Sequence, residues 1–154
     1  MTGFFAGIGI GHVTDRKRHT GCTVFLCPPG TTGSVDVRGP APGSREAALL
    51  APEKPVSVVH AVVFSGGSAF GLATADGVMR YLAEQGVGHP TPVRPIPIVP
   101  AAIVYDLFLG GGARLPDAGM GYAAAQAAAA QQGAAQQAAE AEPVAQGNVG
   151  AGAG

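Results

Sequence analysis

The stretch that decides the fold runs from Val56 to Phe64, with the sequence VSVVHAVVF, and is followed at once by Ser65-Gly66-Gly67-Ser68. Its residues are nearly all apolar and rich in branched valines, which is typical of a strand covered on both faces. The glycines break this strand, and beyond them apolar side chains recur at the three-and-four spacing of a helix. The apolar positions are Leu72, Ala75, Met79 and Leu82, and the polar positions off that stripe are Asp76, Arg80 and Glu84. The centre of the chain is therefore predicted to be a strand, a tight turn and a helix that ends at Gly86-Val87-Gly88.

Further elements are predicted on both sides of this unit. Alternating patterns or apolar runs predict strands over residues 8–15, 23–27, 34–38 and 101–107. A short helical stretch is predicted over residues 44–50. Five prolines between Pro90 and Pro100 exclude a central strand there, because proline removes a ladder donor.

The end of the chain, residues 121–154, has a different composition. Ala and Gln dominate residues 121–142, and because Ala has the best helix propensity we predict a helix there. Residues 147–154 alternate glycine with small residues, which predicts a flexible run. An end of this kind is unusual for a folded domain, so we expect that part of the polypeptide is missing. The mixture of strands and helices assigns the chain to the α/β (α+β) class.

Composition excludes several classes of protein. The 154 residues carry 9 basic and 10 acidic side chains, a formal net charge of −1, so no basic surface for nucleic acid or anionic lipid is predicted. No segment has the roughly 18 consecutive apolar residues of a membrane span, and no secretory signal is visible at the start. We expect a cytoplasmic protein with neither nucleic acid nor a membrane as a partner.

Reactive side chains are few and scattered. Cys22 and Cys27 are five residues apart, and this odd separation points them to opposite faces of a strand, which disfavours a disulfide between them. The four histidines lack metal-ligand spacing, so no metal or cofactor is predicted. His60 is interpreted as a core residue with a satisfied ring, and Asp106 belongs to no recognisable carboxylate pair.

Two positions have both a chemical and a purely structural interpretation. The Ser65–Gly71 turn between strand and helix favours a pocket for an anion or oxyanion, or else a tight turn in which Ser68 caps the helix. Tyr105 follows an apolar run near the predicted end of a strand, where a phenol donates to a developing oxyanion or simply packs in the core. Neither pattern alone decides between the two interpretations.

The motifs taken together resemble one family, the DmpA-type self-processing aminopeptidases. That family includes L-aminopeptidase/D-esterases, β-aminopeptidases and nylon-oligomer endohydrolases. The resemblance rests on segments that follow the family order along nearly the whole chain. These segments are Ile10–Asp15, Thr20–Val24, Val35–Gly39, Pro42–Glu46, His60–Leu72, Ala75–Val78, Pro97–Ile103, Tyr105–Leu107 and Gly147–Gly152.

The resemblance implies a fold and a mechanism. The fold would be an αββα sandwich like that of the N-terminal nucleophile hydrolases, with residues 1–154 as the N-terminal, α-chain-like portion of one such domain. Family members cut their own backbone, and the cut frees a Ser or Thr that attacks the amide or ester. The α-amino group of that residue serves as base, since an unperturbed α-amine has a pKa of about 7.7–8.0.

The resemblance also implies roles for particular residues. Tyr105 matches the family segment that contacts the oxyanion or substrate, and Gly66, Gly67 and Ser68 match part of the pocket wall. Asn148 lies in the matching glycine-rich segment and is expected to face the same pocket. The nucleophile is expected beyond this chain, in a C-terminal, β-chain-like portion. The substrate is expected to be a small peptide, amide or ester, and several αβ units are expected to form an oligomer.

Three alternatives stay open at this point. The chain could be a catalytically inactive, truncated remnant, or a binding module that uses the Ser65–Gly71 turn. It could also be an acyltransferase of the related arginine-biosynthesis type, whose motifs match less well.

Overall fold

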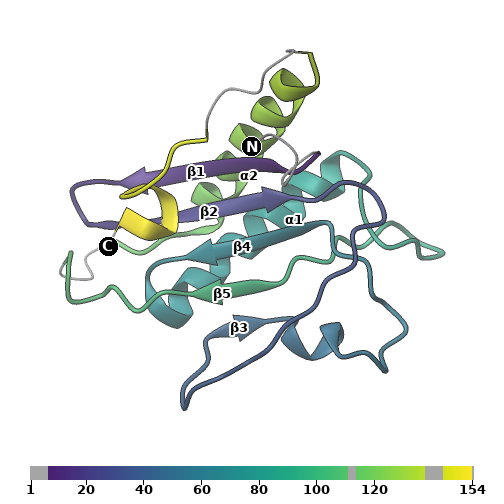
Figure 1. Cartoon of the computed structure of the whole chain (residues 1–154), viewed down its shortest axis with the longest axis horizontal. Helices are drawn as coiled ribbons and strands as arrows, with labels where there is room; N and C mark the ends of the chain where they lie inside the picture. The colour runs from purple at the N-terminus through teal and green to yellow at the C-terminus, as the bar shows by residue number, and fades with distance from the viewer. Residues whose placement is uncertain (1–6, 111–113, 138–143, 154) are drawn as a thin grey trace.

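One five-stranded mixed sheet organises the protein (Figure 1). The computed structural model describes residues 7–110, 114–137 and 144–153. The strands are β1 (Gly9–Asp15), β2 (Thr20–Leu26), β3 (Ser44–Arg45), β4 (Ala61–Ser65) and β5 (Ala101–Ile103). Their order across the sheet is β1-β2-β4-β5-β3.

The pairing follows from the connections between strands. A tight turn joins β1 to β2, and the two strands run antiparallel, with Gly11 opposite Val24. Strand β2 is also antiparallel to β4, while β4 and β5 run parallel, with Phe64 opposite Ala102. Parallel neighbours need a long crossover, and here that crossover contains a helix.

Both α-helices lie on the same face of the sheet (Figure 1). The 3₁₀ helix η2 (Ser68–Ala73) leads directly into α1 (Thr74–Glu84), and α2 (Ala118–Gln137) packs beside it. Two short 3₁₀ helices, η1 (Ala47–Leu50) and η3 (Gly150–Ala153), complete the described elements. A helical layer on one face of a sheet is one half of an αββα sandwich, in agreement with the predicted fold class.

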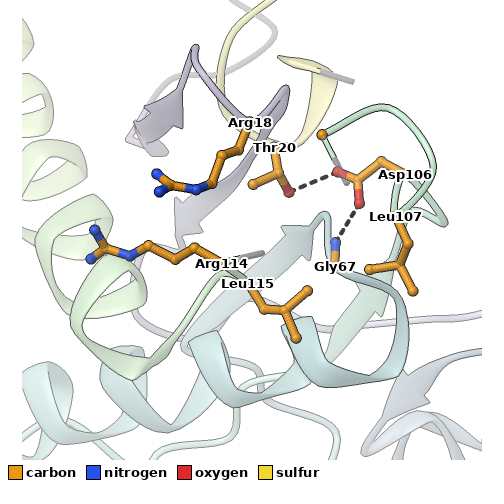
Figure 2. Close-up of a pocket in the computed structure, with 8 residues that line it drawn as sticks. Arg18, Thr20, Gly67, Asp106, Leu107, Arg114 and Leu115 are labelled. Atoms are coloured by element: carbon orange, nitrogen blue, oxygen red, sulfur yellow. Dashed lines mark hydrogen bonds between the residues drawn. The ribbon is translucent and has the colours of Figure 1, made fainter. Parts of the chain in front are cut away.

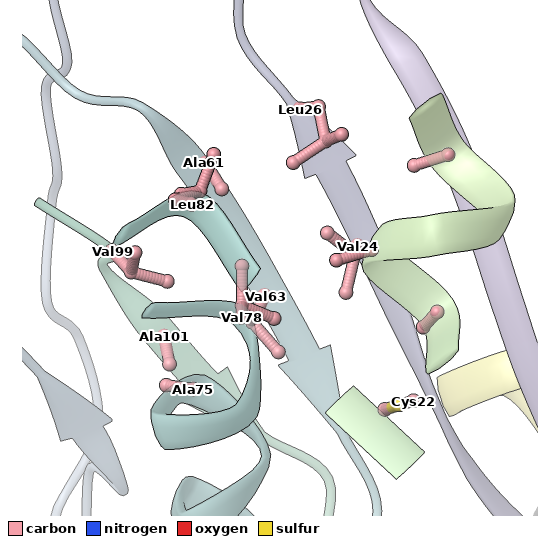
Figure 3. Close-up of a cluster of buried hydrophobic side chains, with 13 residues drawn as sticks. Cys22, Val24, Leu26, Ala61, Val63, Ala75, Val78, Leu82, Val99 and Ala101 are labelled. Carbon is pink, nitrogen blue, oxygen red and sulfur yellow. The ribbon is translucent and has the colours of Figure 1, made fainter. Parts of the chain in front are cut away.

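The core fills the space between the sheet and the helices (Figure 3). Cys22, Val24 and Leu26 alternate along β2 toward the helices, as do Ala61 and Val63 on β4. From α1 the core receives Ala75, Val78 and Leu82, with Leu72 and Met79 partly buried beside them. The predicted helical stripe is therefore confirmed, and Asp76, Arg80 and Glu84 are exposed as expected.

Helix α1 ends at the predicted glycine. Gly86 has a φ of 70°, in the left-handed region that glycine adopts without steric cost. The N–H groups of Gly86 and Val87 donate to the carbonyls of Ala83 and Leu82, at 3.1 and 2.9 Å. This pair of bonds satisfies two terminal carbonyls and stops the helix.

Glycines on β1 allow helix α2 to pack very close to the sheet. At Gly9 and Gly11 on β1, any Cβ would overlap the backbone carbonyls of Ala128 and Ala124. Ala124, Ala125 and Ala128 are fully buried, so small side chains on the helix and absent side chains on the strand bring the two backbones together. The alanine-rich composition thus builds a close contact surface as well as a helix. Residues 138–142 of the predicted helix lie outside the described residues.

Three predicted strands and one predicted helix need correction. The strand predicted over residues 101–107 is limited to Ala101–Ile103. The helical stretch predicted over residues 44–50 begins as strand β3, because Ser44 and Arg45 pair with β5, and becomes helical only in η1. Residues 34–38 form no strand; Val35 and Val37 are 45% and 47% exposed, because no neighbouring strand pairs with this segment. The strand predicted over 56–64 is shorter and lies over Ala61–Ser65. Only one of its faces is covered by the described residues, so Phe64 on the other face stays 43% exposed.

The glycine-rich end also differs from the prediction of a flexible run. Gly150–Ala153 forms η3, which lies on the sheet face opposite the α-helices (Figure 1). The N–H groups of Gly150 and Ala151 donate to the hydroxyls of Thr14 and Thr23, at 2.7 and 3.1 Å. Hydroxyl groups on β1 and β2 therefore hold this segment in place.

Several local predictions hold. His60 accepts a hydrogen bond at Nδ1 from the Ile98 N–H at 3.0 Å, so its ring is satisfied as predicted. It is only partly buried and lies just before β4 rather than in the core, and burial lowers its pKa. Cys22 and Cys27 are both free thiols. Residues 90–100 form a loop with one isolated bridge, from His89 to Ile96. Within the described residues, no helix has the length and apolarity needed to cross a membrane.

The close approach of α2 to β1 gives a first prediction. Gly11→Ala places a methyl group against the backbone of Ala124 and Ala128, which cannot rotate away, so we expect a loss of about 1–3 kcal/mol in unfolding free energy. Urea denaturation measures it. The matched control is Gly133→Ala in α2, where a Cβ meets nothing within 4 Å and helix propensity favours a gain of up to ~1 kcal/mol. Equal effects at both positions would contradict this account of the packing.

Candidate active site

A sharp turn follows the end of β4, and we call residues Ser65, Gly66, Gly67 and Ser68 the Ser65–Ser68 turn. Gly67 and Ser68 have φ values of 81° and 55°. The left-handed region suits Gly67 but is strained for Ser68, at a cost on the order of 1–2 kcal/mol. The N-cap of η2 is Gly67 and no side chain caps it, so Ser68 does not have the capping role that was one of its two interpretations.

The backbone N–H groups of this turn donate within the protein. Gly66 donates to the Gly21 carbonyl at 2.8 Å, and Ser68 donates to the Val104 carbonyl at 3.1 Å. Gly67 donates to Asp106 Oδ1 at 2.6 Å. Since all three donors are engaged, an oxyanion donor from this turn has to be the Ser68 hydroxyl, and another has to come from a neighbouring segment.

Asp106 fixes the turn from the side (Figure 2). It is 3% exposed, and its second carboxylate oxygen, Oδ2, accepts a hydrogen bond from the Thr20 hydroxyl at 2.7 Å. Thr20 begins β2, so one carboxylate joins the β1–β2 hairpin to the turn after β4. Only glycine fits at position 66, because a Cβ there would overlap both Asp106 and Thr20.

Asp106 was missed as a functional candidate because no second carboxylate accompanies it in sequence. The sequence contains a different signal for a buried carboxylate. An acidic residue directly follows Tyr105, and the chain also contains a Ser-Gly-Gly-Ser turn, to which the structure shows that this segment is hydrogen-bonded. A buried carboxylate needs hydrogen-bond donors, and a glycine-rich turn supplies backbone N–H groups.

Tyr105 lies two residues beyond the end of β5 and is 63% exposed. Its ring packs at a tilt of 47° against Phe108, with 5.9 Å between ring centroids. The purely structural interpretation of Tyr105 placed it in the core, and its exposure shows that this interpretation is wrong. The Val104 backbone beside it bonds to both ends of the turn, since its N–H donates to the Ser65 carbonyl at 2.7 Å and its carbonyl accepts from Ser68.

Asn148 lies in the loop that leads to η3 and is exposed. Helix η3 rests on β1 and β2 and also contacts β4 (Figure 1). Within residues 7–110, 114–137 and 144–153, no hydrogen bond joins Asn148 to Tyr105 or Ser68. The structure thus brings Gly66, Gly67, Ser68 and Tyr105 together, and it places Asn148 in a separate segment on the open side of the sheet.

Other titratable groups are tuned by burial. Burial raises the pKa of Cys22 to about 12 and also raises the pKa of Cys27, so both thiols stay protonated near neutral pH. Burial lowers the pKa of His12, whose Nδ1 lies 3.0 Å from the Thr23 hydroxyl beneath η3. His12 Nε2 is buried, and the Ala145 backbone beside the ring opposes part of the effect of burial on the His12 pKa. Within the described part of the chain, no cluster of His, Cys, Asp and Glu could hold a metal ion.

Two hollows lie near the turn. A small one of about 10 Å³, room for about one water molecule, lies between Asp106, Gly67 and the arginines Arg18 and Arg114 (Figure 2). Figure 2 shows both guanidinium groups turned away from the Asp106 carboxylate, and Arg18 pairs instead with Asp15 at 3.0 Å.

The larger hollow is a groove of about 390 Å³, within the size range of small-molecule sites. It extends from the exposed face of β4 to the segment before β3. Its apolar wall includes Val35, Val37, Val62, Phe64 and Ile103. Because Phe64 immediately precedes the turn, the groove begins next to the candidate site.

Comparison with known proteins agrees with the predicted resemblance. Residues 5–154 match the model of peptidase family S58. The chain is 49% identical over 134 residues to an uncharacterised aminopeptidase of Mycobacterium leprae, covering 87% of this chain and 36% of that protein. It is 52% identical over 108 residues to an uncharacterised aminopeptidase of Mycobacterium tuberculosis, covering 70% and 31%. A 6-aminohexanoate-oligomer endohydrolase of Paenarthrobacter ureafaciens is 32% identical over 120 residues, covering 78% and 31%.

These matches have two consequences. The chain spans about a third of the length of these curated relatives. The family model covers the Ser65–Ser68 turn, Tyr105, Asp106 and η3 together. The chain belongs to peptidase family S58.

Proposed function

We propose that this chain is the N-terminal portion of a hydrolase that cleaves amide or ester bonds through a Ser or Thr nucleophile outside these residues. Tyr105 supplies a hydrogen bond to the oxyanion, and the Ser65–Ser68 turn forms part of the pocket wall. The observation that carries the proposal is the exposed Tyr105, held beside a rigid turn in a chain of peptidase family S58.

The mechanism follows from that assignment. The hydroxyl of the nucleophile adds to the substrate carbonyl while its own α-amino group takes the proton. The carbonyl oxygen becomes an oxyanion, and the Tyr105 hydroxyl donates to it. Collapse of this intermediate expels the amine or alcohol, which takes up the proton, and leaves an acyl ester that water hydrolyses.

The location of Tyr105 supports this role. Tyr105 is 63% exposed, so its hydroxyl is accessible to a ligand. The Val104 backbone beside it is bonded to both ends of the turn, which restricts the chain at Tyr105, and its ring lies against that of Phe108. A preorganised donor costs little reorganisation during the reaction, which is the condition for strong oxyanion stabilisation.

The uncovered sheet face supports the expectation of a second portion. Phe64 and Phe25 pack edge to face there, with 6.0 Å between ring centroids, and Val62 lies on the same face. Apolar side chains on a sheet gain free energy when a second layer buries them. We propose that the C-terminal portion contributes that layer and carries the nucleophile into the space between the two sheets.

Intact mass measurement tests the architecture. We expect the complete protein to separate under denaturing conditions into two chains, the second with Ser or Thr as its first residue. A single uncut species that still hydrolyses an amino acid p-nitroanilide contradicts the proposed nucleophile. A single uncut, inert species instead supports the remnant interpretation.

Tyr105→Phe tests the oxyanion role. Removal of one oxyanion donor lowers kcat by roughly 10²–10³-fold, and KM should change little because the donor acts in the transition state. Steady-state kinetics of the complete protein with an amino acid p-nitroanilide measure both constants.

The matched control is Tyr122→Phe. Tyr122 donates to Glu84 at 2.6 Å on the helical side of the sheet, so loss of its hydroxyl should leave kcat unchanged. An unchanged kcat in Tyr105→Phe would assign Tyr105 to packing against Phe108.

Phe64→Ala tests the covered face. If a second layer buries Phe64 in the complete protein, truncation should cost about 3–5 kcal/mol of unfolding free energy, as for other buried phenylalanines. Val93→Ala, at a loop position 90% exposed in this chain, should cost close to nothing. Urea denaturation compares the two variants, and a small, equal effect would show that this face stays in water.

A further inference from the structure

A buried carboxylate without an ionic partner is the feature that the proposed mechanism leaves unused. Asp106 is 3% exposed and forms no ion pair with any residue that the structure describes. Burying a carboxylate is costly unless hydrogen bonds compensate it. Both of its oxygens are engaged by donors that come from other segments of the chain.

Those two bonds connect parts of the molecule that carry the site. Thr20 begins β2, Gly67 lies at the centre of the Ser65–Ser68 turn, and Asp106 is the residue after Tyr105. The Val104 backbone already attaches its segment to Ser65 and Ser68. Asp106 therefore adds a third attachment, which fixes the orientation of the turn relative to Tyr105.

The packing around the carboxylate leaves it little freedom. A Cβ on Gly66 would overlap Asp106 and Thr20, so the turn backbone lies directly against the carboxylate. The hollow beside it has a volume of only about 10 Å³. Movement of Asp106 would require movement of the Gly67 backbone, and with it of Ser68.

We propose that Asp106 is a positioning residue, whose hydrogen bonds to Thr20 and Gly67 hold the Ser65–Ser68 turn and Tyr105 in the geometry that receives the oxyanion. This inference rests on the proposed function for its effect on turnover, but the hydrogen-bonded arrangement itself does not depend on it. A displacement of about 1 Å in such a constellation lowers the rate by up to roughly 10²-fold.

Asp106→Ala and Asp106→Asn separate positioning from charge. The alanine removes both acceptors, whereas the asparagine amide keeps an acceptor for Gly67 and presents N–H to the Thr20 oxygen, which also accepts. We expect kcat for an amino acid p-nitroanilide to fall by roughly 10- to 100-fold in Asp106→Ala, with KM little changed. In Asp106→Asn most of kcat should return.

Two further variants guard against a trivial loss of folding. Thr20→Val removes one of the two bonds with little change in shape, so we expect a smaller loss of kcat than in Asp106→Ala. This variant still tests the proposal if Asp106→Ala does not fold. Val78→Ala truncates a fully buried side chain of α1 away from the site, and it should lower stability without lowering kcat. An equal loss of kcat in Val78→Ala and Asp106→Ala would overturn the positioning role.

Hydrogen exchange supplies a readout that does not depend on turnover. In the complete protein, mass spectrometry of a peptide spanning residues 65–70 should show faster exchange in Asp106→Ala than in the wild type, with protection retained in Asp106→Asn. Unchanged exchange in Asp106→Ala would overturn the proposal. If the wild type does not hydrolyse the p-nitroanilide, the proposed function fails for that substrate, and the exchange measurement still decides whether Asp106 holds the turn.

Discussion

The close contact between α2 and its neighbours is the constraint on which the fold depends. Gly9 and Gly11 on β1 allow the helix backbone to approach, and at Gly77 on α1 and Gly121 on α2 a Cβ would overlap the backbone of the facing helix. Because alanine side chains bury little area, this contact is stabilised by van der Waals attraction between closely approaching backbones rather than by large side chains. Both α-helices therefore lie on one face of the sheet, and the described residues place no α-helix on the opposite face.

The opposite face carries the features associated with chemistry. Thr14 and Thr23 hold the glycine-rich segment over β1 and β2, and Phe64 and the groove lie over β4 and β5. The Ser65–Ser68 turn lies at the end of β4 and Tyr105 lies just beyond β5. In the proposed enzyme these positions suit a site between this sheet and a second one, because functional side chains are concentrated in the loops that follow strand ends.

Local patterns in the sequence were sufficient for the strand–turn–helix unit, the glycine that ends α1 and the hydrogen-bonded His60. They failed where pairing decides structure: residues 34–38 alternate like a strand, but no described strand pairs with them, so they form no strand and stay exposed. The glycine-rich end was predicted to be flexible because composition does not reveal the two threonine hydroxyls, more than a hundred residues away, that hold it. Asp106 was missed for the same reason, since its partners are Thr20 and Gly67.

The hydrogen bonds of the turn restrict what this chain can offer to an oxyanion. With the N–H groups of Gly66, Gly67 and Ser68 engaged, the turn is a rigid support rather than a set of backbone donors. In the proposed function a side-chain hydroxyl is then needed, and we assign that role to the exposed Tyr105, which follows the Val104 backbone that bonds to the turn. Asp106 adds a carboxylate at the point where the turn, the hairpin and the Tyr105 segment meet. The strained φ of Ser68 fits the same arrangement, because such a conformation persists only where its surroundings determine it.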